Sequence, residues 1–319
     1  MSDLHKFLFE GLPVRGVFVR LDDAWQEILR RRQAAGEGWA APVSELMGEM
    51  AAAAVLMQAN IKFNGALVMQ IFGEGPVKVA VAEVQPDLSL RVTAKVMGDV
   101  AEDATLQALV NVGGRGRCAI TLDPKDKLPG QQPYQGVVPL NASLTEGQPR
   151  LAGVLEHYMR QSEQLDTRLL LAADGQHAAG LLIQRLPAEG KGNLAGGQPM
   201  EAEEQLEHFN CIATLAGSVT REELLSLDVD TLLRRLFWQE RVMRFEPQAP
   251  RFACTCSRDR VSAMIRALGQ AEADSIIAEQ GVIDVGCDFC GLHYRFDAVD
   301  AARLFMAPGD QPPVNPGVH

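Results

Sequence analysis

Four of the six cysteines in the chain form two short clusters near one end. Cys254 and Cys256 make a Cys-x-Cys pair, and Cys287 and Cys290 make a Cys-x-x-Cys pair that begins thirty-one positions after Cys256. Two such pairs can place four thiolates at the corners of a tetrahedron, which is the geometry that zinc prefers. The spacing therefore predicts a site for one zinc ion per chain with these four sulfurs as its ligands.

The same sulfurs are candidates for redox chemistry. Zinc keeps thiols deprotonated at neutral pH, and the thiolate is the form that oxidants attack. Cysteines two or three positions apart in a turn can approach within the distance that a disulfide needs, so either pair can oxidise once the metal leaves. Structural, catalytic and sensing roles are all compatible with this pattern of residues.

Four arginines lie near the cysteines in the sequence: Arg251, Arg258, Arg260 and Arg295. A zinc ion held by four thiolates carries a net charge of about −2, which nearby guanidinium groups can offset. We expect these arginines to surround the site, with an ordinary solvated surface as the alternative. His293 is expected at most to brace the second cysteine pair.

The cysteine region is short for a self-supporting domain. Its boundaries are expected near residues 247 and 306. A core of that size supplies at most about 3–5 kcal/mol, whereas a structural zinc contributes about 10–16 kcal/mol of folding free energy. We therefore predict that residues 247–306 form a zinc module that unfolds when the metal is lost.

Composition limits the setting in which such a site operates. The 319 residues carry a formal charge of −11 and a pI near 5.1, so attraction to nucleic acid or to anionic lipid is not expected. The first sixteen residues lack the apolar run of a signal peptide, and no stretch is long and apolar enough to span a membrane. We expect a cytoplasmic protein, whose thiols are kept reduced.

Strand and helix patterns predict an α+β domain over residues 1–187. Strands are expected at Val14–Leu21, on either side of Asn64 and Gly65 within 61–72, and at 76–84, 88–97, 117–124, 134–140, 167–174 and 177–187. Helices are expected at about 24–32, 42–60, 105–111 and 143–160. Asp22 is the expected N-cap of the first helix, and Asn64 with Gly65 is expected to form a hairpin turn. The strands come in runs, which predicts a mainly antiparallel sheet rather than a doubly wound parallel one.

Residues 188–246 are predicted to be a linker followed by a metastable helical segment. The stretch 188–200 is rich in glycine and has no apolar period, while Thr220 and Glu223 have the spacing of a capping box. Leu232, Leu233, Leu236 and Phe237 would share one face of a helix. Such short helices are marginal alone and must pack on another surface. The proline-rich tail, 307–319, is expected to be disordered.

The remaining residues give weaker signals. The glycine-rich stretch from Gly113 to Cys118 lacks the spacing of a nucleotide-binding loop and is expected to be a turn. Cys118 and Cys211 stand alone, and no Ser/His/Asp set or pair of acids suggests an enzyme. A zinc-ribbon regulator that binds nucleic acid and a thiol–disulfide oxidoreductase remain as alternatives, each disfavoured by charge or by the position of the Cys-x-x-Cys pair.

At the level of whole motifs, "FACTCSRDR" and "CDFCGLHYRF" closely resemble the redox-switch signature of the bacterial redox-regulated heat-shock holdases, the thirty-three-kilodalton heat-shock protein family. The resemblance extends to "FLFEGLPVRG", "GEGPVKVAV", "YQGVVPL", "YMRQSEQLDTRLLL" and "TREELLSL", and so covers nearly the whole chain in order. The departures are the glycine-rich linker, the proline-rich tail and the loop "DPKDKLPGQQP", none of which includes a clustered cysteine.

This resemblance implies a zinc-loaded, reduced and inactive state in which the middle segment covers an apolar surface of the N-terminal domain. Peroxide or hypochlorous acid, together with unfolding stress, would expel zinc and form the disulfides Cys254–Cys256 and Cys287–Cys290. The activated protein would bind unfolding client proteins without ATP, as a homodimer, and would be a chaperone rather than an enzyme.

Overall fold

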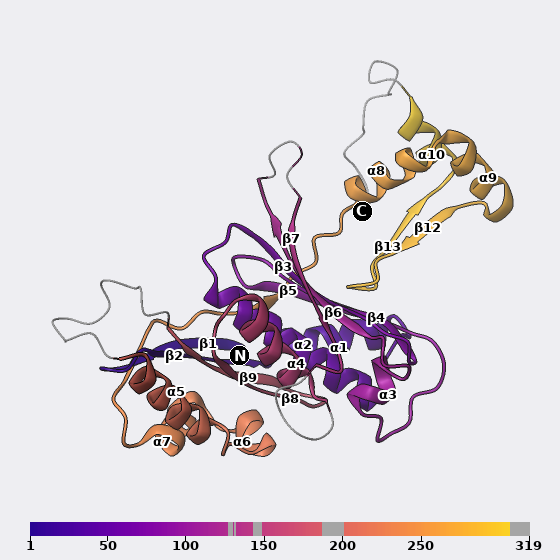
Figure 1. Ribbon diagram of the computed structural model, residues 1–319. Coiled ribbons are helices and arrows are strands. Elements are labelled where there is room, and N and C mark those ends of the chain that lie inside the picture. Colours follow the sequence, from indigo (N-terminus) through magenta and orange to yellow (C-terminus); the bar gives the residue numbers. More distant parts are fainter. Residues whose placement is uncertain (127–129, 131, 143–148, 187–200, 307–319) are drawn as a thin grey trace. The chain divides into compact units, whose positions relative to one another are not determined.

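The computed structural model describes residues 1–126, 130, 132–142, 149–186 and 201–306. The chain divides into two compact units that meet in the sequence between Ala253 and Cys254 (Figure 1). Within the described ranges, no helix is both long enough and apolar enough to cross a bilayer. The predicted linker at 188–200 and the predicted tail at 307–319 lie outside these ranges.

The first unit contains two sheets. The five-stranded sheet has the order β10-β1-β2-β9-β8, and the six-stranded sheet has the order β11-β5-β4-β3-β6-β7. All pairs are antiparallel except β11 with β5. The bounds of the strands are β1 Asp3–Phe9, β2 Val14–Leu21, β3 Gly65–Phe72, β4 Val77–Val84, β5 Ser89–Val96, β6 Arg117–Pro124, β7 Tyr134–Pro139, β8 Thr167–Ala173, β9 Ala178–Arg185, β10 Val242–Arg244 and β11 Arg251–Phe252. The predicted α+β class with mainly antiparallel strands is confirmed.

One long helix, α2 (Ala41–Asn60), forms the centre of this unit. It packs against strands of both sheets and is buried on nearly every side, as its run of alanine, leucine and methionine requires. Pro42 occupies its first turn, where no intrahelical N–H is lost. The other helices of this part are α1 (Asp23–Ala34), α3 (Leu106–Val110) and α4 (Leu151–Ser162).

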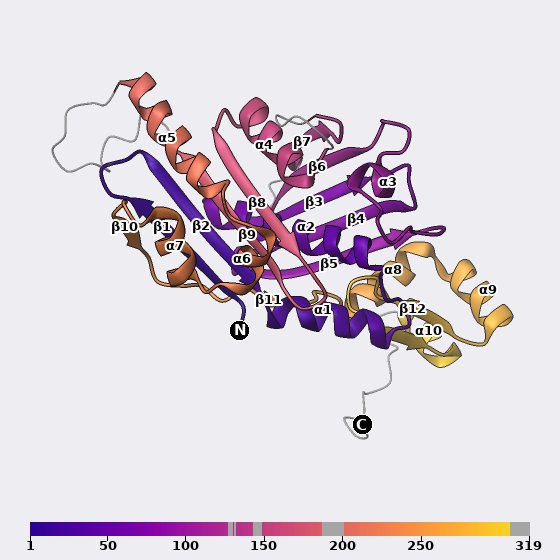
Figure 2. The ribbon, with the colours of Figure 1, turned by 90° about the horizontal axis from the view of Figure 1, so that it is seen from below.

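Three short helices, α5 (Ala202–Ala216), α6 (Arg221–Ser226) and α7 (Val229–Phe237), cover one face of the five-stranded sheet (Figure 2). We call them the linker helices. The apolar side chains between these helices and the sheet form a separate core, which includes Phe7, Phe9, Phe18, Leu181, Ile183, Phe209, Ile212, Leu232, Leu236 and Phe237. The predicted capping box of Thr220 and Glu223 is present, and the predicted apolar face of α7 is buried.

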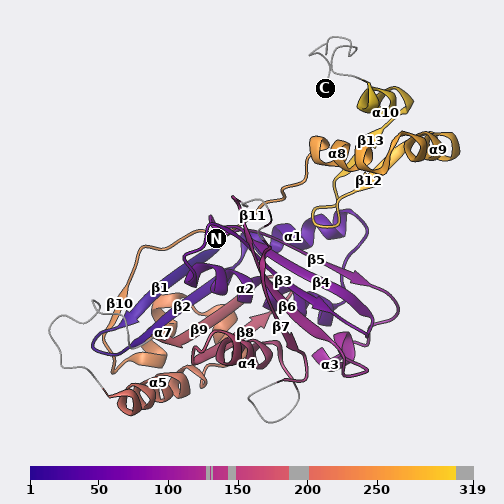
Figure 3. The same ribbon diagram turned by 45° about the horizontal axis from the view of Figure 1, so that its top comes forward.

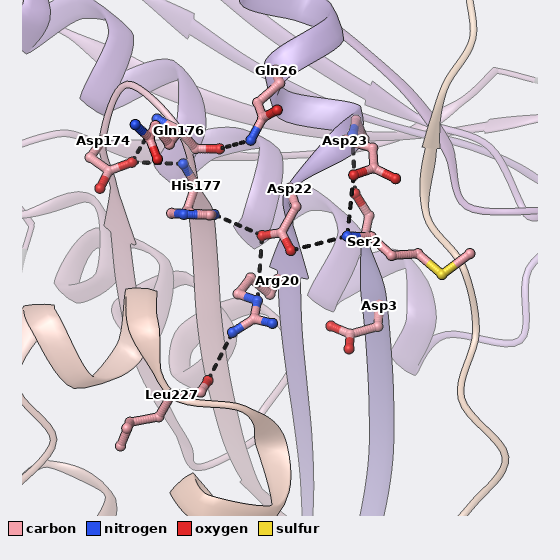
Figure 4. A network of polar contacts seen from close by, with 12 residues as sticks. Ser2, Asp3, Arg20, Asp22, Asp23, Gln26, Asp174, Gln176, His177 and Leu227 are labelled. Carbon is pink, nitrogen blue, oxygen red and sulfur yellow. Dashed lines mark hydrogen bonds and ion pairs between the residues drawn. The ribbon is translucent and has the colours of Figure 1, made fainter.

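A polar network at the end of β2 also fastens the linker helices (Figure 4). Arg20 donates a hydrogen bond of 3.0 Å to the carbonyl oxygen of Leu227, between α6 and α7. Arg20 also lies 3.4 Å from Asp22, which further contacts His177 at 2.8 Å and the N-terminal amine of Met1 at 3.3 Å. Asp22 therefore precedes α1 in the predicted N-cap position, but its side chain makes no capping hydrogen bond because it is engaged by these partners.

The second unit is small. It contains α8 (Arg258–Leu268), α9 (Gln270–Gln280), the hairpin of β12 (Ile283–Gly286) and β13 (His293–Phe296), and α10 (Ala298–Phe305) (Figure 3). Its buried core consists of five residues: Ile265, Ala273, Ile283, Phe296 and Ala301. A core of this size leaves the unit dependent on another source of stability.

Two predictions about local structure were wrong, and several elements were not predicted. Asn64 and Gly65 do not form a hairpin turn, because residues 61–64 connect α2 to β3 and the partners of β3 are β4 and β6. The helix predicted at 143–160 begins only at Leu151, and residues 143–148 lie outside the described ranges. Strands β1, β10 and β11 and helix α10 were not predicted.

Candidate metal and redox centre

The four clustered cysteines come from two loops of the second unit. Cys254 and Cys256 precede α8, whose N-cap Ser257 accepts a hydrogen bond from the Arg260 amide. Cys287 and Cys290 lie in the turn between β12 and β13, where the amide of Gly291 donates to the carbonyl of Cys287 at 2.8 Å. Gly291 has a φ of 68°, which a glycine adopts without strain.

The four sulfur atoms all lie within 4.8 Å of one another. Two of the separations are 3.6 Å between Cys254 and Cys287 and 3.4 Å between Cys256 and Cys290. A zinc ion with bonds of about 2.3 Å to four sulfurs at tetrahedral corners requires sulfur–sulfur separations of about 3.8 Å. All four cysteines are free thiols, and the geometry fits a single metal ion at the centre of the cluster.

The electrostatics of the cluster also favour a cation. Burial raises the pKa of Cys254, but hydrogen bonds from the Cys256 amide and from the neighbouring thiols outweigh it and lower that pKa to about 7. Burial raises the pKa of both Cys287 and Cys290. The sulfurs therefore do not all ionise together on their own near neutral pH. A divalent cation would remove this conflict by stabilising every thiolate at once.

Tyr294 is a part of the site that the sequence analysis missed. Its hydroxyl donates a hydrogen bond of 3.1 Å to the sulfur of Cys256, and this bond, followed by burial, raises the pKa of Tyr294. The sequence signal is its position on the return strand, four residues after Cys290. Only the pairing of β12 with β13 shows that its side chain reaches a sulfur of the first pair.

Three of the four neighbouring arginines have partners other than the sulfurs. Arg251 pairs with Asp87 in the first unit. Arg258 donates to the carbonyl oxygen of Arg295 at 2.9 Å and to Asp300 at 2.7 Å. Arg295 bonds Asp284 at 3.0 Å, and His293 contacts the same carboxylate at 2.7 Å. The role of these arginines in offsetting thiolate charge stays a prediction, as does that of Arg260.

The two solitary cysteines lie apart from this centre. Cys118 is fully buried in the core of the first unit, and burial raises the pKa of its thiol to about 12, so the thiol is inert near neutral pH. Cys211 lies exposed on α5. Among the described residues, the only group that could hold a metal ion is the one formed by the four clustered cysteines.

Comparison with known proteins agrees with this fold. The family model described as "Hsp33 protein" matches residues 2–297. Proteins named 33 kDa chaperonin from Methylobacillus flagellatus and Chromobacterium violaceum are both 42% identical to the chain and cover 95% of it, over 94% and 93% of their own lengths. The crystal structure of the 33 kDa chaperonin of Thermotoga maritima has the same fold. The two structures superpose with a TM-score of 0.74 at 17% sequence identity, and the match covers 95% of this chain and 98% of the Thermotoga maritima chain. The chain belongs to the Hsp33 family.

Proposed function

We propose that this protein is a redox-regulated, ATP-independent chaperone that holds unfolding client proteins after oxidation. The single observation that carries this proposal is the cluster of four free thiols within 4.8 Å of one another, in a unit with a five-residue core. Family membership and the names of the relatives support a chaperone rather than an enzyme. The four sulfurs supply a reason for regulation by oxidants.

In the reduced state, Cys254, Cys256, Cys287 and Cys290 would hold one zinc ion as four thiolates. The ion would supply cross-linking that the small core cannot, since structural zinc contributes about 10–16 kcal/mol to folding. Tyr294 would keep the sulfur of Cys256 oriented through its hydrogen bond. We propose this zinc-loaded form as the resting state.

Oxidation would then remove the cross-link. Each pair of thiolates gives two electrons to one molecule of peroxide, which takes up two protons and leaves as two molecules of water. The proposed products are the disulfides Cys254–Cys256 and Cys287–Cys290, following the family resemblance. A disulfide sulfur carries no charge and is a poor zinc ligand, so the ion leaves and the second unit loses its main source of stability.

Loss of zinc in the second unit would affect the linker helices through the polypeptide that connects the two units. The amide of Ala253, the residue directly before Cys254, donates to the carbonyl of Leu90. Unfolding of the second unit would free this end, loosen the preceding segment and allow α5–α7 to leave the apolar face of the five-stranded sheet. We propose that unfolding cytoplasmic proteins bind the exposed surfaces and that the active form is a homodimer.

The proposal is tested by following zinc content, free thiols and light scattering on the same sample. Oxidised, zinc-free protein should suppress aggregation of a thermally unfolding client at near-stoichiometric ratio, while reduced, zinc-loaded protein should not. Peptide mapping by mass spectrometry should find the two proposed disulfides. Equal suppression by both states would contradict regulation by oxidation, and multiple turnover of a disulfide substrate would favour an oxidoreductase.

A further inference from the structure

The same short stretch of chain supplies the outermost strand at one edge of each sheet of the first unit. Residues 241–253, here called the edge segment, follow the linker helices and include β10 and β11. Strand β10 is the outermost strand of the five-stranded sheet, beside β1, and β11 is the outermost strand of the six-stranded sheet, beside β5 (Figure 3). Without this segment, β1 and β5 would present open edges.

The edge segment is held to β1 by main-chain hydrogen bonds along almost the whole strand. The amide of Glu10 donates to the carbonyl of Arg241 at 2.9 Å, and the amide of Phe245 donates to the carbonyl of Lys6 at 3.0 Å. Leu4 and Gln248 exchange two hydrogen bonds, of 2.8 Å and 2.9 Å. The edge of β1 is therefore a row of donors and acceptors that an extended polypeptide can satisfy.

Apolar side chains add little to this attachment, whereas Arg244 contacts His5 of β1 at 3.0 Å and Arg251 pairs with Asp87. Pro250 is the only buried residue of the edge segment, and Met243 and Phe245 are 45% and 47% exposed. Val242 is half-buried and packs against the core beneath the linker helices. Main-chain hydrogen bonds do not depend on sequence, so another extended chain with an apolar residue in the place of Val242 can make the same contacts.

We propose that the edge of β1 is a strand-binding site for extended segments of unfolded client polypeptide, which replace the edge segment after oxidation. This inference rests on the proposed function, because the segment leaves only when the cysteine unit opens. The client adds an antiparallel or parallel strand beside β1, bound mainly through its backbone. A site of this kind accepts many sequences, because unfolded chains share their backbone groups and differ in side chains.

The test is residue-resolved hydrogen exchange on the full-length protein, with a chemically unfolded client as the probe. Along residues 3–10, which comprise β1 and the residue after it, alternate amides face the edge segment, including those of Leu4 and Glu10, while the others face β2. Oxidation should speed exchange at Leu4 and Glu10 at least tenfold, and added client should slow it again by a similar factor. The β2-facing amide of Phe7 is the internal control and should stay protected throughout.

Two results would overturn the inference without touching the proposed function. The first is suppression of client aggregation while Leu4 and Glu10 stay unprotected. The second is that both amides are already protected in oxidised protein without client, which would show that the edge segment of the same or a second copy occupies the edge. If oxidised protein fails to suppress aggregation at all, the proposed function is wrong, and the inference falls with it.

A pair of variants gives a second measurement. Lys6→Pro removes an amide that lies, by alternation along the strand, on the same side as those of Leu4 and Glu10, but keeps the carbonyl that accepts from Phe245. Oxidised Lys6→Pro should bind the unfolded client about three- to tenfold more weakly than oxidised Lys6→Ala, the loss expected for one hydrogen bond. Equal affinities in two variants with matching zinc content and melting temperature would overturn the inference. The exchange experiment on the unaltered protein decides the question if Lys6→Pro does not fold.

Discussion

The four clustered sulfur atoms lie within 4.8 Å of one another, in Cys254, Cys256, Cys287 and Cys290. This space can hold one cation, but four thiolates without a cation would repel one another. The pKa of Cys254 is lowered while the pKa values of Cys287 and Cys290 are raised, so in the absence of metal the charge concentrates on part of the cluster. The hydroxyl of Tyr294 is a neutral donor that stabilises the sulfur of Cys256 without competing for the metal.

Tyr294→Phe tests this contribution, because it removes only the hydroxyl. We expect the variant to retain its fold but to bind zinc about tenfold more weakly, the loss typical of a missing partner of a metal ligand. Competition with a zinc chelator measures the change, and faster oxidation of the thiols should accompany it. Tyr134→Phe, which removes a hydroxyl that contacts Glu163 in the first unit, is the matched control. Zinc affinity equal in the two variants would contradict the role given to Tyr294.

The sequence predicts which cysteines lie together better than it predicts their surroundings. Cysteine spacing alone identifies the candidate ligands, because so few other patterns explain two close pairs. The contact of Tyr294 could not be predicted, since it depends on how β13 returns beside β12. The partners of Arg251 and Arg258, which are Asp87 and Asp300, are likewise fixed by folding rather than by proximity in sequence.

Among the elements, α7 provides the largest apolar contribution of the linker helices to the sheet. Its residues Leu232, Leu236 and Phe237 are at most 2% exposed and pack in the core that includes Phe7 and Phe9. Ring centroids of Phe9 and Phe237 lie 4.9 Å apart in an edge-to-face arrangement. Helices as short as α6 and α7 depend on such contacts, so their attachment can be weakened by one side chain.

Leu232→Ala should loosen the linker helices in the reduced, zinc-loaded protein. A buried leucine replaced by alanine typically costs about 2–5 kcal/mol, which is comparable to the stability of so small an attachment. We expect faster limited proteolysis within residues 201–244 and partial suppression of client aggregation without oxidant. Leu206→Ala, at an exposed position on α5, serves as the control. Reduced Leu232→Ala that resists protease as well as the control does would show that release does not depend on this packing.

Elements whose sequence carries its own apolar pattern were predicted more accurately than elements that form only beside a distant partner. Helix α2 and strands β2, β4 and β6 carry their own apolar pattern and were predicted nearly to the residue. Strands β10 and β11 contain three and two residues and have no pattern of their own. They form because β1 and β5 offer free edges to pair with. Strand β10 could not be predicted from its neighbours in the sequence, because its partner β1 lies more than two hundred positions away.

At the scale of the whole molecule, the edge segment connects directly to the first cysteine of the sulfur cluster, with no linker residue between them. Ala253 makes the last hydrogen bond to the six-stranded sheet, and Cys254 is the next residue. A short connection transmits the loss of fold in one unit directly to the backbone of the other, whereas a flexible one would absorb it. The proposed regulation therefore depends on this junction.

Inserting three glycines between Ala253 and Cys254 should weaken that coupling. Zinc binding and the rate of thiol oxidation should stay unchanged, because both belong to the second unit. The difference in protease sensitivity of residues 241–253 between the reduced and oxidised states should shrink. The same insertion after Gly196, within the glycine-rich stretch, controls for added chain length. A difference as large as in the parent protein would mean that the signal takes another route.

The short length of β10 and β11 affects how readily other chains can pair with the sheet edges that these strands form. An open strand edge invites other chains to pair with it, and proteins commonly blunt such edges with very short strands and proline. At one edge of each sheet, the outermost strands β10 and β11 span three and two residues, with Pro247 and Pro250 between them, whereas β8 and β7 form the opposite edges. At these two edges a neighbouring copy therefore finds few unpaired backbone groups, which should limit edge-to-edge aggregation there.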